Sequence, residues 1–419
     1  MHKSRTYHDP LHGAITLRGD DPTERLLIKI IDTPEFQRLR RIRQLDTASL
    51  TFHGAEGSRF THSLGVMHLT RRAFDHIVRK YPHLEPHRVV VLLAALLHDV
   101  GHSAFSHAGE EIFGSAHEAW TCRLIQESSL AKILEEYQPV TNLRELLPQV
   151  YAKSYPIPLI HQLVSSQLDC DRLDYLQRDS YFTGASYGRL DLDRIIMAMA
   201  YDPVSQKLVV TPKGLVAIEH YLAVRYFMYL QVYNHPKNLA ARFVLSQIFR
   251  RAQELLAEPM SDNQIFADAT VRAWLSKVNS DLTCREYLAG DDTVFMYHIH
   301  CWRSCADPVL ADLCRRFLDR DIFKAQDISG LDSVARQTLL QEWQSKLAMY
   351  GLPAKYYCGI RTALTKGYTI YQQGIDIQTT QGLQDISQLS PLVQTLAEPI
   401  QKAWFIYPPL DKLADRLSK

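Results

Sequence analysis

The chain has 419 residues, of which 46% are hydrophobic and 22% are charged, so it is long enough for one large core and a smaller satellite domain. Lys and Arg number 47 against 46 Asp and Glu, so no overall field attracts nucleic acid or a membrane, and any anionic ligand needs a local cluster of bases. The N-terminus lacks an apolar signal core and no run reaches the roughly 18 apolar residues of a membrane span, which predicts a cytoplasmic protein.

Residues 1–255 are predicted to be mostly helical. A capping residue and Pro34 begin a helix near Asp32, and another helix begins near Arg59. The segment 88–99 is too uniformly apolar for a surface helix, so we place it at the centre of a bundle, ending at Gly101. Further helices are predicted at 158–179 and 191–200, with a short strand at 209–211. Residues 214–255 form one long helix or two, with Pro236 marking a kink or break.

The region after about residue 260 alternates helical stretches with β-like pieces at 368–371 and 375–378. The fold class is therefore predicted to be mainly α. It consists of a helical core over residues 1–255 and a smaller mixed α/β region over residues 256–419. We expect the C-terminal region to serve oligomerisation or regulation.

His98 and Asp99 stand side by side at the end of the apolar run 89–97. An adjacent imidazole and carboxylate can place two unlike ligands on one cation, although a polar helix end explains the pair equally well in isolation. A cation that binds phosphate and activates water needs a few such ligands and open positions. Three predicted helices supply two imidazoles and two carboxylates, which we predict to bind a divalent ion (Fe, Mn, Zn, Ni or Mg): His62, His98, Asp99 and Asp171.

The acidic segment after residue 168 has two interpretations. In a helix, Asp171, Tyr175 and Asp179 are spaced i, i+4 and i+8 and lie on one stripe, which can carry a ligand, a phenol and a second acid into one cavity. The alternative is a solvated face on which Asp174 and Arg178 pair at i, i+4. The histidine motifs around it favour the cavity.

The 7 cysteines form no C-x-x-C pair, which is typical of a reducing compartment. Cys301, Cys305 and Cys314 lie near His298 and His300, and these five could form a zinc cluster. Their irregular spacing favours ordinary helix packing instead.

The histidine and acidic motifs resemble the HD-domain metal-dependent phosphohydrolase superfamily, and the words around them resemble its dNTP triphosphohydrolase branch. These words are DPLHG at 9–13, IDTPEFQRLR at 31–40, RFTHSLG at 59–65 and HDVGH at 98–102. The resemblance covers residues 5–250 and continues weakly to about 325. It implies a helical HD-domain catalytic core over residues 1–255, hydrolysis of a dNTP to deoxynucleoside and tripolyphosphate, and a homo-oligomer, either a dimer or a tetramer.

The resemblance also implies roles for residues of the site. The metal ligands are the four named above. Residues that line the reacting phosphate, with a catalytic role, are His102, His107, Glu110 and His117. Residues that bind substrate are Gln44, Leu45, Arg59, Arg172, Tyr175, Asp179, Arg225, Tyr229, Tyr233 and Lys237. The tyrosine ring of Tyr175 beneath the sugar would exclude a 2′-hydroxyl by shape.

Weaker likenesses imply effector sites for GTP or a dNTP. The residues concerned are Arg5, Asp32, Gln37, Arg40, Asp191, Arg194, Arg320 and Lys324. Two alternatives to the dNTP triphosphohydrolase remain at this point. One is an HD phosphohydrolase acting on another nucleotide or on nucleic acid, and the other is a nucleotide-sensing protein with little turnover.

Overall fold

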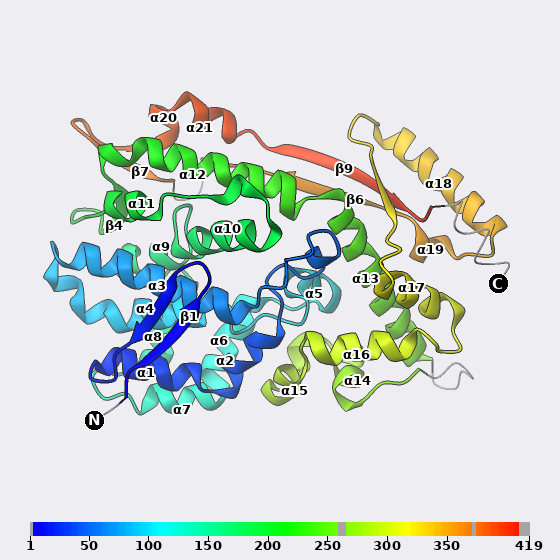
Figure 1. The fold of residues 1–419 in the computed structure, drawn as a ribbon, viewed down its shortest axis with the longest axis horizontal. Helices are drawn as coiled ribbons and strands as arrows, with labels where there is room; N and C mark the ends of the chain where they lie inside the picture. The colour runs from blue at the N-terminus through cyan, green and yellow to red at the C-terminus, as the bar shows by residue number, and fades with distance from the viewer. Residues whose placement is uncertain (1–2, 259–264, 371–373, 410–419) are drawn as a thin grey trace.

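The computed structural model describes residues 3–258, 265–370 and 374–409, and most of these residues are helical (Figure 1). The first half contains α1 (Pro22–Ile31), α2 (Pro34–Arg38), α3 (Arg59–Val78), α4 (Arg88–Leu97), α5 (Ser106–Phe113), α6 (His117–Glu127), α7 (Ser129–Glu135), α8 (Leu143–Tyr151), α9 (Pro158–Val164), α10 (Cys170–Thr183), α11 (Leu192–Ala198) and α12 (Leu215–Met228). The second half contains α13 (Pro236–Ala257), α14 (Ala269–Ser276), α15 (Cys284–Ala289), α16 (Asp292–Trp302), α17 (Pro308–Leu318), α18 (Ser333–Met349), α19 (Ala354–Tyr357), α20 (Ile386–Leu389) and α21 (Pro391–Leu396). The predicted mainly α fold is confirmed.

Three small sheets accompany the helices. β1 (Arg5–Asp9) and β2 (Gly13–Leu17) form an antiparallel hairpin. A four-stranded sheet has the order β3 (Met199–Asp202), β4 (Lys207–Val210), β7 (Asp376–Thr379) and β8 (Gly382–Asp385), with β4 and β7 parallel. A three-stranded antiparallel sheet has the order β5 (Lys324–Asp327), β9 (Ile400–Tyr407) and β6 (Gly359–Thr365).

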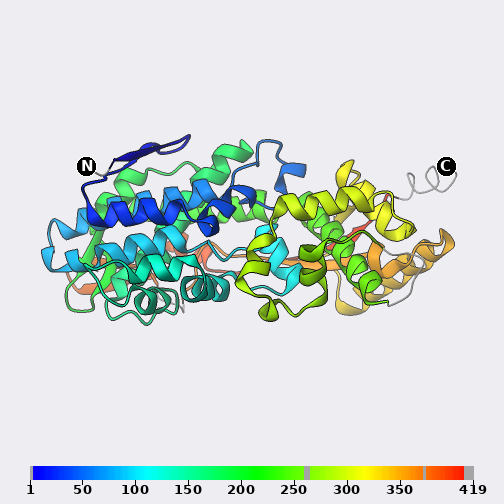
Figure 2. The same ribbon diagram turned by 90° about the horizontal axis from the view of Figure 1, so that it is seen from below.

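Two hydrophobic cores stand at opposite ends of the elongated molecule (Figure 2). The first is built from residues 15–232 and is completed by 368–396, because β7, α20 and α21 return to it. The second core contains side chains from the helices α13 through α19 and from β9, together with aromatic side chains from residues 105–120. The long strand β9 runs from the middle of the molecule toward α18 and α19 (Figure 1). The division of the chain near residue 255 stays a prediction, since both cores draw on separate parts of the sequence.

The central helix is α4. Each of its nine apolar residues from Val89 to Leu97 is buried, as the uniformly apolar pattern predicts. α4 packs against α3, and α3 packs against α10. The polar residues that follow the last turn of α4 therefore emerge between three packed helices.

Several element boundaries differ from the predictions. The single helix predicted at 158–179 is wrong: α9 ends at Val164 and α10 begins at Cys170. The break forms because the Asp169 carboxylate accepts the backbone N–H groups of Ser166 and Arg172, both at 2.7 Å. For residues 214–255, the alternative of two helices with a break at Pro236 is confirmed, and Pro236 is the first residue of α13.

The strand predicted at 209–211 is confirmed as β4, and the one at 375–378 as β7. The strand predicted at 368–371 is wrong over 368–370, and residue 371 lies outside the described residues. The Tyr368 ring is buried there and its hydroxyl accepts the Ile375 N–H at 2.8 Å, so this segment is held by side-chain packing. The N-terminal hairpin was not among the predicted elements.

Candidate metal centre

Three packed helices bring the predicted metal ligands together. His62 lies one turn into α3, and Asp171 is the second residue of α10. His98 and Asp99 follow directly after α4, the buried central helix. Ligands from distant parts of the sequence therefore converge because the apolar faces of α3, α4 and α10 pack side by side.

His62, His98 and Asp99 offer ligand atoms that all lie within 4.8 Å of one another, and Asp171 approaches the two imidazoles. The His62 and His98 Nε2 atoms are 3.3 Å apart, and Asp171 Oδ1 lies 3.0 Å from the first and 3.6 Å from the second. Asp99 Oδ1 lies 3.3 Å from His98 Nε2 and Asp99 Oδ2 lies 3.6 Å from His62 Nε2. Two ligand atoms at about 2.1 Å from one cation are separated by roughly 3.0–3.4 Å at octahedral or tetrahedral angles, so the set fits a divalent metal.

The outer nitrogen of each imidazole is already engaged. His62 Nδ1 lies 2.8 Å from Asp174 Oδ2, and His98 Nδ1 donates to the Ala95 carbonyl at 2.8 Å. A proton on Nδ1 leaves Nε2 as the lone-pair nitrogen facing the carboxylates. This carboxylate-or-carbonyl support is the usual second layer of a histidine metal site.

Buried carboxylates give the centre an excess of negative charge. Burial alone would lower the pKa of His62, but Asp171 and Asp174 outweigh it and raise that pKa to about 10. Burial would raise the pKa of Asp99, but the Arg59 guanidinium and neighbouring histidines hold it well below its ordinary value. Without a cation, the site therefore retains protons that metal binding must displace.

A second group of imidazoles adjoins the metal ligands. His102 Nε2 lies 3.2 Å from Asp99 Oδ1, and the His102 and His117 rings stack with centroids 4.1 Å apart. Glu110 bridges two histidines: Oε2 lies 2.7 Å from His107 Nδ1 and Oε1 lies 2.5 Å from His117 Nδ1. Burial would raise the pKa of Glu110, but its bonds to these histidines lower it. The predicted pairing of His107 with Glu110 thus forms in the structure.

Three of the predicted metal ligands, His98, Asp99 and Asp171, line a cavity of about 440 Å³. Arg59, at its wall, donates to Asp99 Oδ2 at 2.5 Å and to Ser106 Oγ at 2.8 Å. Predicted substrate residues that line the cavity are Gln44, Leu45, Arg59, Arg172, Tyr175, Asp179, Tyr229 and Tyr233. The buried Oε1 of Gln44 and Nε of Arg172 have no hydrogen-bond partner within the described residues. The cavity therefore combines metal ligands, bases and aromatic rings.

The stripe predicted on α10 is confirmed, since Asp171, Tyr175 and Asp179 all face this cavity. The Tyr233 hydroxyl donates to Asp179 Oδ2 at 2.8 Å, and the Tyr175 and Tyr233 rings lie 5.9 Å apart at 79°. Tyr229 contacts Tyr233 at 5.0 Å between ring centroids. Three tyrosines thus form one wall.

Burial makes the contribution of Asp179 to folding stability depend on pH. It raises the pKa of this carboxyl to about 7, although the Tyr233 hydroxyl donates to it. The folded chain then holds a proton more tightly than the unfolded chain, so stability from this group is present below about pH 4 and lost as the pH rises through 7. Between pH 6 and pH 7.5 the native protein loses this contribution and Asp179→Asn does not. We therefore expect the free energy of unfolding of Asp179→Asn, relative to that of the native protein, to rise by about 1 kcal/mol over this pH range.

Urea unfolding of the metal-free protein at both pH values measures this difference. Asp20→Asn, at an exposed position, is the control. Equal pH dependence of the native protein and the Asp179 variant would contradict the expected effect of burial.

Two predicted substrate residues do not line the cavity. Arg225 lies behind Tyr229, with its guanidinium 5.9 Å from that ring and Nη1 donating to Gln167 at 2.8 Å. Lys237 belongs instead to a separate hollow of about 640 Å³. The restart of the helix at Pro236 directs Lys237 to this neighbouring hollow, which it shares with Arg320 and Lys324.

The remaining predicted effector residues form local pairs. Arg5, in β1, forms an ion pair with Asp32 at the end of α1. Gln37 accepts from Arg40 at 2.8 Å and donates to the Ile31 carbonyl at 2.7 Å. Asp191 caps α11 by accepting the Arg194 N–H at 3.0 Å, and neither residue lines the hollow that holds Arg320 and Lys324. Their assignment to effector binding stays a prediction.

Sequence reasoning missed some residues of the site. Asp174 and Arg178 pair at 2.7 Å, but both side chains are fully buried, so the alternative of a solvated face is wrong. Asp46 and Arg242 also line the cavity, joined at 2.7 Å. Asp46 has a φ of 42°, in the left-handed region. It lies outside any helix, so helical spacing in the sequence does not identify it.

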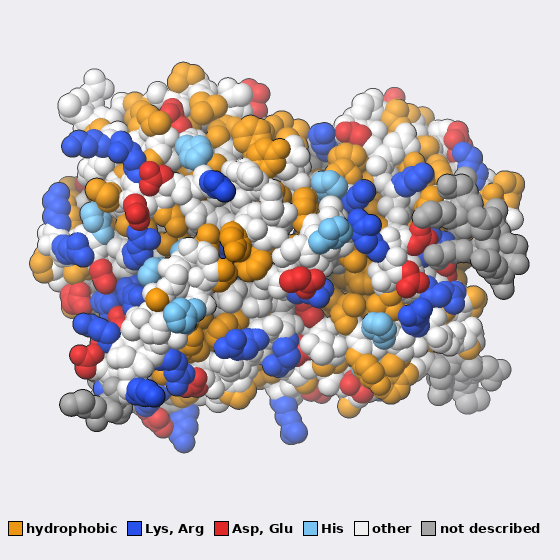
Figure 3. Space-filling model, viewed as in Figure 1, with side chains coloured by type: hydrophobic (Ala, Val, Ile, Leu, Met, Phe, Trp, Pro, Cys, Tyr) orange, Lys and Arg blue, Asp and Glu red, His pale blue; other side chains and the backbone are white. Residues whose placement is uncertain are grey.

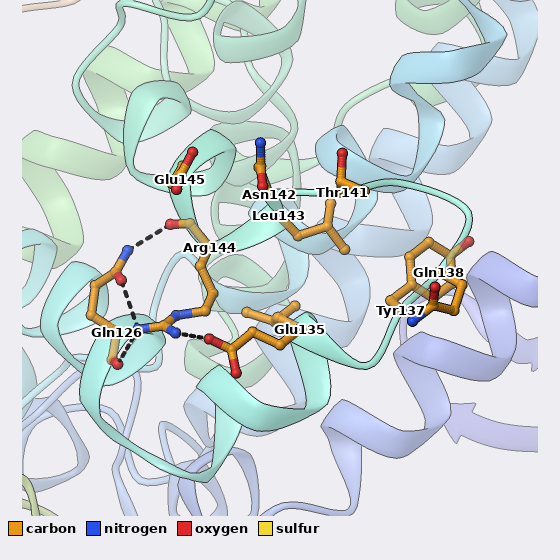
Figure 4. A pocket seen from close by; sticks show the side chains of 10 residues that line it. Gln126, Glu135, Tyr137, Gln138, Thr141, Asn142, Leu143, Arg144 and Glu145 are labelled. Atoms are coloured by element: carbon orange, nitrogen blue, oxygen red, sulfur yellow. Dashed lines mark hydrogen bonds and ion pairs between the residues drawn. The ribbon is translucent and has the colours of Figure 1, made fainter.

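Other features of the molecule bear on the alternatives. Among the described residues, the groups able to hold a metal are those around the cavity, and the cysteines near His298 do not form one. A hollow of about 370 Å³ between α6, α7 and α8 has its Arg144 occupied by Gln126 and Glu135 (Figure 4). Within the part of the chain that the structure describes, no helix has the length and apolar character needed to cross a bilayer.

The surface carries acidic and basic side chains interspersed over the visible face, without a field of one sign (Figure 3). This distribution agrees with the near-zero net charge of the sequence, which is +1 with histidine neutral. The guanidinium groups of Arg59, Arg172 and Arg242 line the cavity, next to its carboxylates. An anionic ligand would be held there locally.

Comparison with known proteins finds two family models along the chain. The HD domain model matches residues 59–179, which span every predicted metal ligand, and the HD associated region model matches residues 190–352. The uncharacterized protein YwfO of Bacillus subtilis is 34% identical, over 99% of this chain and 94% of that protein. The structure of a phosphohydrolase from Bacteroides thetaiotaomicron superposes with a TM-score of 0.84 at 28% identity, covering 97% of this chain and 100% of that chain.

The helical bundle and its histidine–aspartate centre define an HD-type phosphohydrolase. Within that class, the chain belongs to the family that joins an HD domain to an HD associated region and that includes YwfO. A more distant relative is the deoxynucleoside triphosphate triphosphohydrolase SAMHD1 homolog of Dictyostelium discoideum. It is 29% identical over 60% of this chain and 50% of its own length.

Proposed function

We propose that the protein hydrolyses dNTPs to deoxynucleoside and tripolyphosphate, using a divalent metal ion. The observation that carries the proposal is the composition of the single 440 Å³ cavity, which combines metal ligands, guanidinium groups and a tyrosine wall. A triphosphate requires cations along its length, and a nucleoside requires flat apolar surfaces. The relationship to a protein named as a deoxynucleoside triphosphate triphosphohydrolase supports the same substrate class.

The metal ion, when bound to His62, His98, Asp99 and Asp171, would supply Lewis acidity toward a phosphoryl oxygen. Arg59 and Arg172 neutralise charge on the triphosphate, with Arg225 adding to the positive field from behind the tyrosine wall.

His107 would transfer the proton that the leaving 5′-oxygen needs, or take one from the attacking water. His102 and His117 lie beside it. Glu110 orients His107 because its carboxylate accepts a hydrogen bond from His107 Nδ1. The Nε2 atom of His107 is then left for this transfer.

The tyrosine wall would distinguish deoxynucleotides from ribonucleotides. The Tyr175 ring would lie against the sugar, so a 2′-hydroxyl would meet the ring face, and Asp179 would accept from the 3′-hydroxyl. Tyr229, Tyr233, Gln44 and Leu45 complete the enclosure around the sugar and base.

We also propose that the enzyme acts as a homo-oligomer, a dimer or a tetramer, and responds to GTP or a dNTP as effector. Exposed apolar side chains on α10, α11 and α12 support self-association, including Tyr181, Met197 and Phe227. Arg320, Lys324 and Lys237 share a hollow large enough for a nucleotide.

The deciding experiment supplies each dNTP, each NTP and a cyclic dinucleotide, singly and in mixtures, and identifies the products by anion-exchange chromatography. We expect tripolyphosphate and deoxynucleoside from dNTPs, with NTPs turned over at least about tenfold more slowly. Release of orthophosphate or pyrophosphate would contradict the proposal in favour of another phosphohydrolase. Tight nucleotide binding without turnover under any divalent metal would instead indicate a sensor.

A further inference from the structure

The N-terminal hairpin reaches the metal centre from outside the three ligand-bearing helices. His12 lies in the turn between β1 and β2, and its side chain is only 3% exposed. Its Nε2 is 2.6 Å from Oδ1 of Asp174. The other oxygen of this carboxylate is the one that engages Nδ1 of the metal ligand His62. One buried carboxylate therefore joins the hairpin to a metal ligand.

Arg178 closes a second connection between the same parts. It donates from Nε and Nη2 to Asp174 at 2.7 and 3.0 Å, and from Nη1 to Asp9 Oδ2 at 2.9 Å. The other carboxylate oxygen of Asp9, Oδ1, accepts hydrogen bonds from the backbone N–H groups of Leu11 and His12, both at 2.9 Å. The turn that carries His12 is thus fixed by the same guanidinium that holds Asp174.

The carboxylate of Asp174 has no room to take another position. A Cβ atom placed on Gly65 of α3 would overlap Asp174 Oδ1 and come within 2.5 Å of Arg178 Nη2. Because α3 approaches closely at this glycine, the carboxylate is confined between His12, His62 and Arg178. Its orientation is then set by His12 on one side and by Arg178 on the other.

We propose that the hairpin turn is a working part of the metal centre and that His12 is a positioning residue for it. His12 orients Asp174, and Asp174 holds the proton on Nδ1 of His62, so that Nε2 points its lone pair at the cation. Displacement of the turn releases one side of the carboxylate and lowers metal affinity. The inference rests on the metal centre of the proposed function and does not depend on which phosphorylated compound is the substrate.

The test measures Mn²⁺ binding to chelator-treated full-length protein without nucleotide, by electron paramagnetic resonance of the free ion. We expect His12→Ala to weaken Mn²⁺ binding about tenfold or more. His12→Gln keeps an N–H donor near the position of Nε2 and is expected to bind Mn²⁺ within about threefold of the native protein. His8→Ala, an exposed histidine on the same hairpin, serves as the matched control and is expected to leave binding unchanged.

Native Mn²⁺ affinity in His12→Ala would overturn the proposal, as would equal loss in His12→Ala and His12→Gln. Circular dichroism of each variant establishes that it is folded. If His12→Ala is unfolded, Asp9→Asn decides, because it weakens the hold of Arg178 on the turn while keeping its shape. Wild-type binding in Asp9→Asn then overturns the proposal. Failure to hydrolyse dNTPs would contradict the proposed substrate and leave the Mn²⁺ result intact.

Discussion

The His98→Ala protein is expected to lose its bound divalent metal and at least about 10³-fold of its phosphohydrolase activity, since Lewis-acid stabilisation contributes several kcal/mol. His98 Nε2 lies within 3.6 Å of three other ligand side chains, so its removal opens the set. The outer bond of His98 is a single one, to the Ala95 carbonyl. Metal analysis by mass spectrometry and a rate assay give the two measurements.

His87→Ala is the matched control, because His87 immediately precedes the opposite end of α4 and bonds to Tyr155 at 2.7 Å away from the centre. Asp99→Ala is a poorer test, since it would leave Arg59 buried with Ser106 as its remaining side-chain partner. Retention of one metal ion per chain by His98→Ala, with native activity, would contradict the assigned ligand set.

The sequence predicts how His98, Asp99 and Asp171 are placed, because each lies in a strong local pattern. The run before His98 is apolar at every position, so only a buried central helix accommodates it, and the polar pair must then emerge inside the bundle. The spacing of Asp171, Tyr175 and Asp179 likewise fixes one stripe of a helix. Local periodicity therefore specified which residues share a face.

Local periodicity does not specify what covers a face. Asp174 and Arg178 are spaced as a surface pair, and the same spacing serves equally well for a buried one. What buries them is the hairpin, whose Asp9 and His12 precede them by more than 160 residues. Similarly, the end of a helical pattern at Pro236 predicts a break but not the direction of the next helix, and Lys237 lies in the hollow with Arg320 and Lys324 rather than in the cavity.

The largest stability effect is expected from Arg178→Met, which removes the cation between two buried carboxylates. The side chain of Arg178 is fully buried, and those of Asp174 and Asp9 are 0% and 4% exposed. Burial would raise the pKa of Asp174, but Arg178, His12 and His62 hold it well below its ordinary value. Methionine fills most of the same space without charge. We therefore expect the free energy of unfolding to fall by about 3–5 kcal/mol, the usual result of breaking a buried pair from one side.

Arg72→Met is the matched control, because Arg72 pairs with Asp193 while the two side chains are 34% and 78% exposed. Solvent screens that pair, so its loss is expected to cost about 0–1 kcal/mol. Urea unfolding followed by tryptophan fluorescence compares the two variants. Equal losses would mean that the contacts of His12 and His62 with Asp174, at 2.6 and 2.8 Å, are enough to stabilise this buried carboxylate without Arg178. A loss confined to Arg178→Met would place the guanidinium at the centre of the link between hairpin and metal ligand.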